Sequence, residues 1–200
     1  MKNKVIVKGY SAPEVNKSEI LRYLGAAEGD ITPLVDSCLC EAEDKLIYRL
    51  CYAEFPVCIE GESIDLGFTT VSSHSLAVCL AECDTIALMC ATVGVGIDRL
   101  IKRYSSVTPS RSVVLQAIGS ERVEALCDLF CDELRAEKAS LGKTIRPRFS
   151  PGYGDLPLDV QRAVFGALSP EKYIGVSLGA DLFMTPTKSV TAIIGIKNVK

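Results

Sequence analysis

The feature that most constrains the fold is a nearly uninterrupted apolar run in the middle of the chain, Thr85–Thr92. A strand of this composition must be covered on both sides, so the run predicts a strand buried on both faces. A chain of 200 residues can supply that cover, since it buries roughly 70% of its extended surface on folding. No repeat, low-complexity tract or break in composition divides the chain, so we expect one domain, residues 1–200.

Local patterns predict short helices and strands on both sides of this run. The expected helices span 16–25, opened by Asn16 and ended by Gly25; 32–46, capped by Asp30 or Thr32; 72–80; 97–104; 111–138, with a joint at Gly119–Ser120; and 156–168. The expected strands span 5–7, closed by Gly9; 47–59, interrupted by Pro56; 64–68, after a turn at 60–63; 85–92; 174–176; and 190–196. Residues 141–155 are expected to be irregular. The element order predicts an α+β fold, a largely antiparallel sheet flanked by helices.

Charge and hydropathy exclude several classes of protein. The net charge of −3 lacks the basic surface that nucleic-acid binding needs, so we expect no nucleic-acid partner. The longest apolar stretches fall well short of the roughly 20 residues that cross a bilayer. The N-terminal residues do not form the apolar core of a signal peptide. We therefore expect a cytoplasmic protein that is neither exported nor membrane-embedded.

Nine cysteines without an export signal indicate a reducing compartment, where thiols persist. Cys79 and Cys83 are four residues apart, as are Cys127 and Cys131, so each pair lies on one helical face. Together, four thiolates of this kind would suit zinc or an iron–sulfur cluster. Most of the cysteines stand in apolar runs, which favours core packing. A cysteine-based metal or redox protein remains the alternative interpretation.

Two further motifs resemble parts of known functional sites. Gly94 and Gly96 form a Gly-x-Gly turn before a helix, as in dinucleotide-binding loops, but the third glycine would fall at Arg99. A tight turn is favoured, with a carboxylate at the helix N-terminus as a minor option. His74 is the only histidine, and it stands among serines at a helix start. This context favours capping or a surface position over a hydrolytic triad.

The most unusual stretch is the loop rich in glycine, proline and arginine around Arg148–Tyr153. Pro151 and Gly152 suit the centre of a type II turn. Glycine there and at Gly154 lets a ligand approach the backbone. Arg148 is suited to gripping a carboxylate, and Tyr153 offers a ring for adenine or a cation. These residues are compatible with an anionic or amphoteric small-molecule site, or with a rigid structural loop.

The pattern Arg-x-x-x-Gly-Tyr at Arg148–Tyr153 resembles the S-adenosylmethionine (AdoMet) motif of the reactivation domain of cobalamin-dependent methionine synthase. Further segments resemble the same family, in the same order along the chain: 91–100, 117–125, 174–178, 184–186 and 189–190. The resemblance covers residues 85–196. Residues 1–84 would be a less recognisable N-terminal part of the same domain. The resemblance implies the activation-domain fold and AdoMet as ligand.

The resemblance also implies roles for individual residues. Arg148 would hold the ligand, and Phe149 and Ser150 would supply neighbouring backbone contacts. Gly152 would give clearance, and Tyr153 would line the site. No catalytic residue and no metal ligand is assigned.

Glu124 matches a helix glutamate that faces the ligand in the family, although it also stands beside Asp128 on what resembles a solvated helix face. Two acidic positions of the family fall at Ser120 and Ala180, and its C-terminal Tyr-Phe contact is missing. No base-off cobalamin motif surrounds His74. Cobalamin would therefore be reached only through a partner.

The implied function is that of an activation component rather than a complete enzyme. It would be an AdoMet-binding factor supporting reductive methylation of the cobalamin of a separate corrinoid-dependent methyltransferase of the methionine synthase type. A flavodoxin- or ferredoxin-type protein would supply the electron. The altered positions Ser120 and Ala180 motivate an alternative, an AdoMet-binding or regulatory module without methyl transfer.

Overall fold

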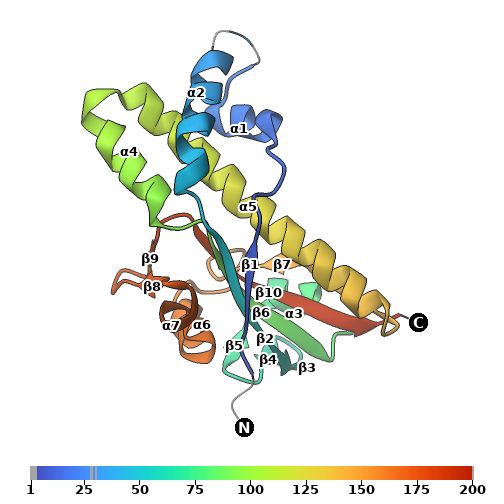
Figure 1. The fold of residues 1–200 in the computed structure, drawn as a ribbon. Coiled ribbons are helices and arrows are strands. Elements are labelled where there is room, and N and C mark those ends of the chain that lie inside the picture. The colour runs from blue at the N-terminus through green and yellow to red at the C-terminus, as the bar shows by residue number, and fades with distance from the viewer. Residues whose placement is uncertain (1–3, 28, 30, 200) are drawn as a thin grey trace.

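The computed structural model describes residues 4–27, 29 and 31–199. Its centre is a five-stranded sheet in the order β1-β2-β6-β10-β7, with every neighbouring pair antiparallel (Figure 1). The strands are β1 (Ile6–Tyr10), β2 (Tyr48–Pro56), β6 (Thr85–Thr92), β7 (Lys143–Phe149) and β10 (Ser189–Asn198). This architecture confirms the predicted α+β class with an antiparallel sheet flanked by helices.

Strand β6 lies in the middle of this sheet and is buried on both faces, as its composition predicts. Alternate side chains enter two separate apolar cores. Ala87, Met89 and Ala91 face one core, and Ile86, Leu88 and Cys90 face the other. The sheet is therefore the middle of three layers.

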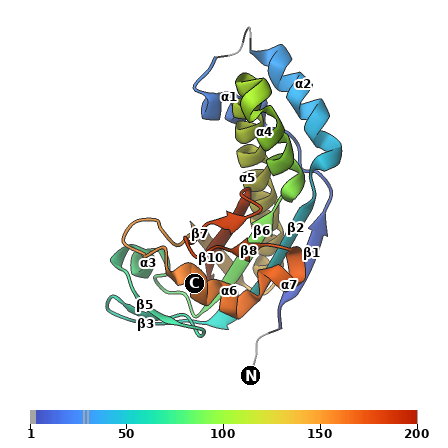
Figure 2. The same ribbon diagram turned by 90° about the vertical axis from the view of Figure 1, so that its left-hand side faces the viewer.

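The layer on the first face consists of helices, and the layer on the second is mixed (Figure 2). The first contains α1 (Lys17–Leu24), α2 (Thr32–Ala42), the 3-10 turn η1 (Glu43–Lys45), α4 (Val95–Val107) and α5 (Pro109–Ala139). The second contains α3 (His74–Cys79), α6 (Val160–Leu168), α7 (Pro170–Ile174) and a small sheet of β3 (Cys58–Glu60), β4 (Ser63–Asp65) and β5 (Thr70–Ser72). A short hairpin of β8 (Ser177–Leu178) and β9 (Met184–Thr185) precedes β10.

Capping residues fix several helix ends as the sequence predicts. The side chain of Asn16 accepts a hydrogen bond from the backbone N–H of Glu19, and Gly25 ends α1 in the left-handed conformation. Ser73 caps α3 in the same way. In α2, Thr32 is the first helical residue rather than the cap. The alternative cap, Asp30, lies outside the described residues.

The prediction that residues 141–155 are irregular is wrong, because residues 143–149 form the edge strand β7. Proline is tolerated on an edge strand and at bulges. The register of the β7–β10 pair shifts between Ile194 and Ile196, which places Pro147 at such a bulge. The composition of this segment therefore reflects its place at the sheet edge.

Other boundaries also differ from the sequence-based prediction: the strand expected at 47–59 is divided into β2 and β3, the strand expected at 64–68 covers 63–65, and the helix expected at 32–46 ends at Ala42. Ile174 ends α7, and Gly175 caps that helix in the left-handed conformation, so the predicted strand at 174–176 does not form. Helix α6 begins at Val160 rather than at position 156, because the preceding backbone is held in turns. Strand β1 continues through Gly9 to Tyr10 by pairing with β2.

Helix α5 passes through Gly119 without the predicted joint. A β-carbon on Gly119 would lie 2.9 Å from Cγ of Lys188, so this glycine makes room for a neighbouring side chain. The glycine at position 119 is therefore explained by the close packing of Lys188 on the helix, not by a bend in the helix.

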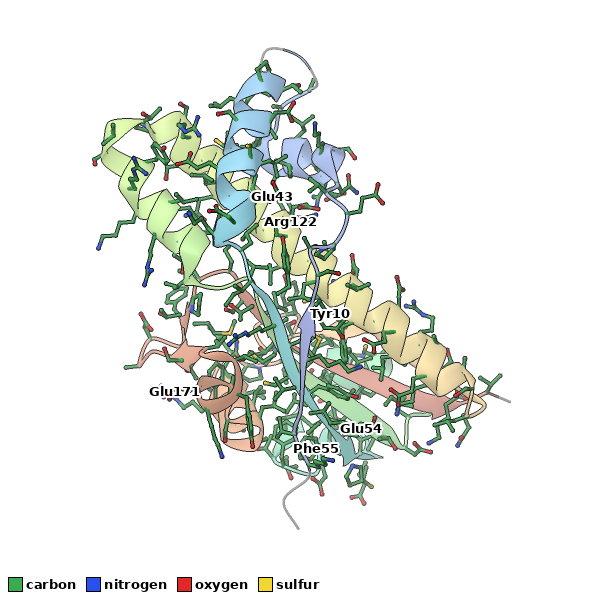
Figure 3. The ribbon with its side chains drawn as sticks, in the orientation of Figure 1. Tyr10, Glu43, Glu54, Phe55, Arg122 and Glu171 are labelled. Carbon is green, nitrogen blue, oxygen red and sulfur yellow. The ribbon has the colours of Figure 1, made fainter. Side chains whose placement is uncertain are left out.

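A buried ion pair on α5 fixes the N-terminal segment in place. Figure 3 labels its arginine, Arg122. The Arg122 guanidinium donates to both carboxylate oxygens of Glu121 at 2.5 Å, and to the carbonyls of Pro13 and Glu14 at 2.7 Å. Glu121 also accepts from the backbone N–H of Asn16 at 2.9 Å. Because these charges are almost fully buried, each depends on the other for compensation.

We predict that Arg122→Met lowers the free energy of unfolding by about 3–5 kcal/mol, because it leaves the Glu121 carboxylate buried without a cation. Urea denaturation at pH 7 measures the change. The double variant Glu121→Gln/Arg122→Met removes both charges and should recover part of the loss. A double variant no more stable than Arg122→Met would contradict this account.

Candidate functional site

Arg148 and Glu124, which the sequence singled out separately, meet in the structure. Arg148 lies on β7, where it pairs with Ile194 and faces the helical layer. Its Nη2 atom is 2.7 Å from Oε2 of Glu124, and its Nη1 atom is 2.9 Å from Oδ1 of Asp128. Glu124 and Asp128 are four residues apart and share one face of α5. One guanidinium therefore donates a hydrogen bond to Glu124 and lies at ion-pair distance from Asp128.

The three side chains differ in how far they reach into solvent. The Arg148 side chain is 22% exposed, whereas those of Glu124 and Asp128 are 43% and 72% exposed. Burial by itself would lower the pKa of Arg148, but the neighbouring thiols and carboxylates raise it above the usual arginine value. Arg148 thus stays charged and holds the two carboxylates at the surface.

The loop after β7 forms the predicted turn. The carbonyl of Ser150 accepts a hydrogen bond from the backbone N–H of Tyr153 at 3.2 Å, which places Pro151 and Gly152 at the two central positions. Gly152 has φ of 90°, as the third residue of a type II turn requires. The turn leaves the Tyr153 side chain 69% exposed. An aromatic ring is therefore presented to solvent beside the end of β7.

The far end of this loop is tied to α3 through Asp155. Its carboxylate accepts from Oγ of Ser73 at 2.5 Å and from the backbone N–H groups of His74 and Ser75 at 2.7 and 3.1 Å. The Ser73 hydroxyl and these backbone donors hold the pKa of Asp155 well below its usual range. The loop is thus fixed at both ends.

The remaining predicted site residues lie near this cluster but point elsewhere. Phe149 faces the opposite layer from Arg148, because successive residues of a strand alternate, and it packs against the second core. Ser150 is half-buried at the start of the turn. The structure thus brings the side chains of Arg148 and Glu124 together. Phe149 and Ser150 are close to this pair only because they follow Arg148 in the chain.

A groove of about 620 Å³ lies against the same face of α5, between that helix, α1 and the segment before α1. Six carboxylates line it: Glu14, Glu19, Glu121, Glu124, Asp128 and Asp132. Arg22 and Tyr23 complete the wall. Burial, followed by the charge of Glu124, raises the pKa of Tyr23, so its phenol stays neutral. This groove favours a ligand with positive charge.

Sequence reasoning missed the contribution of α1 to this groove. The spacing of Glu124 and Asp128 was available as a signal that both face one side of α5. Glu19 and Tyr23 gave no such signal, because they reach the groove only through the packing of α1 on α5.

The Gly-x-Gly turn is not a ligand loop. A β-carbon on Gly96 would lie 2.0 Å from the carbonyl oxygen of Lys45, and one on Gly94 would lie 2.4 Å from the Ile47 side chain. The chain between η1 and β2 therefore covers the start of α4, which confirms the tight turn. His74 is exposed in the first turn of α3, with Glu62 3.6 Å away, as its context predicts.

The cysteine pairs do not form one metal site. Among residues 4–27, 29 and 31–199, no group of three or more His, Cys, Asp or Glu side chains is arranged to hold a metal ion. Cys127 and Cys131 are buried within the first core. Burial raises the pKa of both, and of Cys79 and Cys83, which disfavours the thiolate that metal binding requires. Core packing accounts for Cys127 and Cys131, and Cys83 packs at the edge of the second core.

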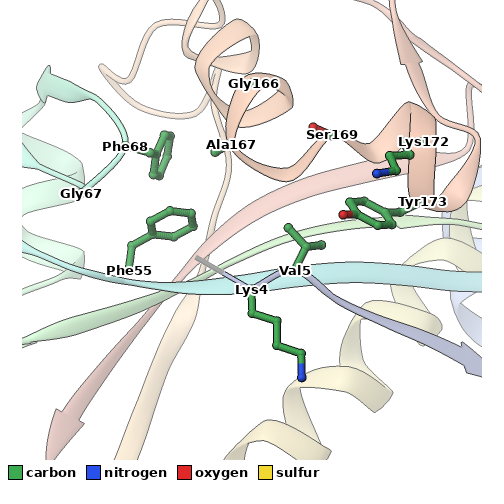
Figure 4. Close-up of a pocket in the computed structure, with 10 residues that line it drawn as sticks. All are labelled: Lys4, Val5, Phe55, Gly67, Phe68, Gly166, Ala167, Ser169, Lys172 and Tyr173. Carbon is green, nitrogen blue, oxygen red and sulfur yellow. The ribbon is translucent and has the colours of Figure 1, made fainter. Parts of the chain in front are cut away.

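A second pocket, of about 520 Å³, lies on the other side of the sheet between β2, α6 and α7 (Figure 4). Phe55 and Phe68, with ring centroids 5.1 Å apart, stand at one end, and Lys172 and Tyr173 stand at the other. None of the predicted site residues lines it.

Comparison with known proteins identifies the fold. No family model matches the chain, and no curated protein matches its sequence. The structure is similar to a crystal structure of the MetH reactivation domain bound to AdoHcy, with a TM-score of 0.73 over 97% of this chain and 78% of that one. The sequences are 14% identical. The chain thus has the fold of the methionine synthase reactivation domain, as predicted. No helix of the described residues has the length and apolar character needed to span a membrane.

We predict that Asp155→Asn lowers thermal stability at pH 7, and that the difference from the unmodified protein disappears as the pH falls. The folded-state pKa of Asp155 is depressed, so its charge stabilises the fold above the unfolded pKa of about 3.9 and loses that effect below it. Thermal melts between neutral pH and acid measure this.

Asp159→Asn is the matched control, because Asp159 has no ion pair or side-chain hydrogen bond to any described residue. An equal loss in both variants would refute the role given to Asp155.

Proposed function

We propose that this protein binds AdoMet at the cluster formed by Arg148, Glu124 and Asp128. The observation that carries the proposal is the convergence of a motif arginine and a helix glutamate, 24 residues apart, at 2.7 Å. The similar structure is that of a domain bound to AdoHcy, the demethylated form of the same ligand, which supports the choice.

The chemistry of the site matches the parts of this ligand. The sulfonium and amino groups of AdoMet are cationic, and Glu124 and Asp128 present partly exposed negative charge to them. Arg148 fixes both carboxylates in position. The exposed ring of Tyr153 offers a face on which adenine can stack. A β-carbon on Gly152 would lie 3.2 Å from Cδ1 of Leu158, so this glycine lets the turn that carries Tyr153 pack against that side chain.

We further propose that the protein acts as a reactivation factor. AdoMet would supply a methyl group to the cobalamin of a separate corrinoid-dependent methyltransferase, with an electron from a flavodoxin- or ferredoxin-type protein. The likeness in fold to the MetH reactivation domain supports this role. In such a reaction this chain binds and orients the methyl donor, and the partner carries the reacting cobalt.

Ligand binding is tested by thermal shift and calorimetry with AdoMet and AdoHcy, using ATP as a negative control. AdoMet at about a hundred times its dissociation constant should add about 2.7 kcal/mol, or roughly 5–10 °C in Tm. Tyr153→Ala should weaken binding by about tenfold or more without destabilising the fold, because the ring is exposed.

Tyr173→Ala, an aromatic change in the other pocket, is the control for that variant. Arg148→Ala should abolish binding while the fold survives. Unchanged AdoMet affinity in both Tyr153→Ala and Arg148→Ala would refute the assignment.

Methyl transfer is tested separately, with the cobalamin-binding part of a methionine synthase from which its own reactivation domain has been removed. With a chemical reductant and AdoMet, this protein should restore the absorbance of methylcobalamin, and the Arg148→Ala variant should not. The altered positions Ser120 and Ala180 motivate the regulatory alternative, which predicts AdoMet binding without that absorbance change.

A further inference from the structure

Lys188 is an unusual cation beside the proposed site. It is half-buried in the connection between β9 and β10, and its aliphatic stem lies against Gly119 of α5. A β-carbon at Gly119 would lie 2.9 Å from Cγ and 3.1 Å from Cε of Lys188. The absence of a side chain at Gly119 therefore lets the lysine lie across the helix.

The only hydrogen-bond partner of the Lys188 ammonium group among the described residues is an uncharged hydroxyl. Its Nζ atom donates to Oγ of Ser120 at 3.0 Å, and no carboxylate of the described residues lies within ion-pair distance. Asp98, whose charge acts on the pKa of Lys188, already accepts hydrogen bonds from the backbone N–H and hydroxyl of Thr187. Burial lowers the pKa of Lys188, with the charge of Asp98 opposing this. A partly buried cation with no carboxylate at ion-pair distance favours an anionic ligand group.

The position of this cation relative to the acidic residues follows from helix geometry. Ser120, Glu124 and Asp128 are spaced by four residues and share one face of α5. Neighbouring side chains at this spacing are about 5–6 Å apart at Cβ. Lys188 thus stands about one turn from the Glu124 carboxylate, on the same stripe of the helix.

The charge of Arg148 is more fully compensated than that of Lys188. Two carboxylates, Glu124 and Asp128, already compensate its charge at 2.7 and 2.9 Å. The positive end of the stripe is therefore Lys188 with Ser120, and its negative end is formed by Glu124 and Asp128. A ligand that carries a carboxylate at one end and cationic groups a few bonds away matches this order of charges.

We infer that Lys188 and Ser120 bind the carboxylate of the ligand's methionine moiety, while Glu124 and Asp128 face its cationic groups. This inference rests on the proposed AdoMet binding. It transfers to Lys188 the carboxylate-binding role that sequence reasoning gave to Arg148, and it assigns Arg148 to positioning the two acidic side chains.

The test compares AdoMet with decarboxylated AdoMet, which keeps the adenosine and the sulfonium but lacks the carboxylate. Calorimetry should show that Lys188→Met weakens AdoMet binding by about ten- to a hundredfold, the effect of one charge-assisted hydrogen bond. The same variant should bind decarboxylated AdoMet at least as tightly as the unmodified protein. Methionine preserves the apolar stem against Gly119, which favours a folded variant.

Two further variants keep the test specific. Lys197→Met makes the same change further along β10, where the lysine pairs with Glu82, and it should leave both affinities unchanged. Gly119→Ala raises helix propensity while displacing the Lys188 stem, and it should reproduce the ligand-selective loss.

Unchanged AdoMet affinity in Lys188→Met, or an equal loss for both compounds, would overturn the role of Lys188 while leaving the proposed function standing. Binding of neither compound to the unmodified protein would overturn the proposed function, and this inference with it.

Discussion

The buried pair of Glu121 and Arg122 is the interaction on which the arrangement of the molecule around α5 depends. Two opposite charges at 2–4% exposure are tolerable only because they bind each other and because backbone groups of residues 13–16 satisfy their remaining donors and acceptors. The same bonds hold the N-terminal segment on α5 and lead it into α1. Without these bonds α1 and the segment before it, which form one wall of the acidic groove, would not be held against α5.

Helix α5 serves three functions with three faces. One face carries the apolar side chains that fill the first core. A second carries the buried pair that fixes the N-terminal segment. A third carries the stripe of Ser120, Glu124 and Asp128, which contacts Arg148 of β7 and Lys188 of the connection before β10. A long helix crossing a sheet is suited to this, because its period places residues four apart on one face. The site therefore lies where the helix meets β7 and the start of β10.

Sequence patterns predicted the elements whose signals are local. The apolar run at β6 and the helix ends at Asn16 and Gly25 are confirmed, and so is the turn at Pro151 and Gly152. The edge strand β7 was missed, because Pro147 and the neighbouring arginines are typical of loops and acquire strand structure only by pairing with β10. The site was predicted in part. Arg148 and Glu124 carry motif signals, whereas Tyr23 and Lys188 do not.

The sequence by itself determined a strand buried on both faces, the helix caps and the type II turn, since backbone preferences and capping act over a few residues. Only the tertiary structure decided which side chains meet. Arg148 reaches Glu124 across 24 residues, Lys188 reaches Ser120 across 68, and Arg122 reaches Pro13 across 109. Such contacts depend on how the layers pack on the sheet, and the packing is fixed by the shape and charge of the whole core rather than by any local pattern.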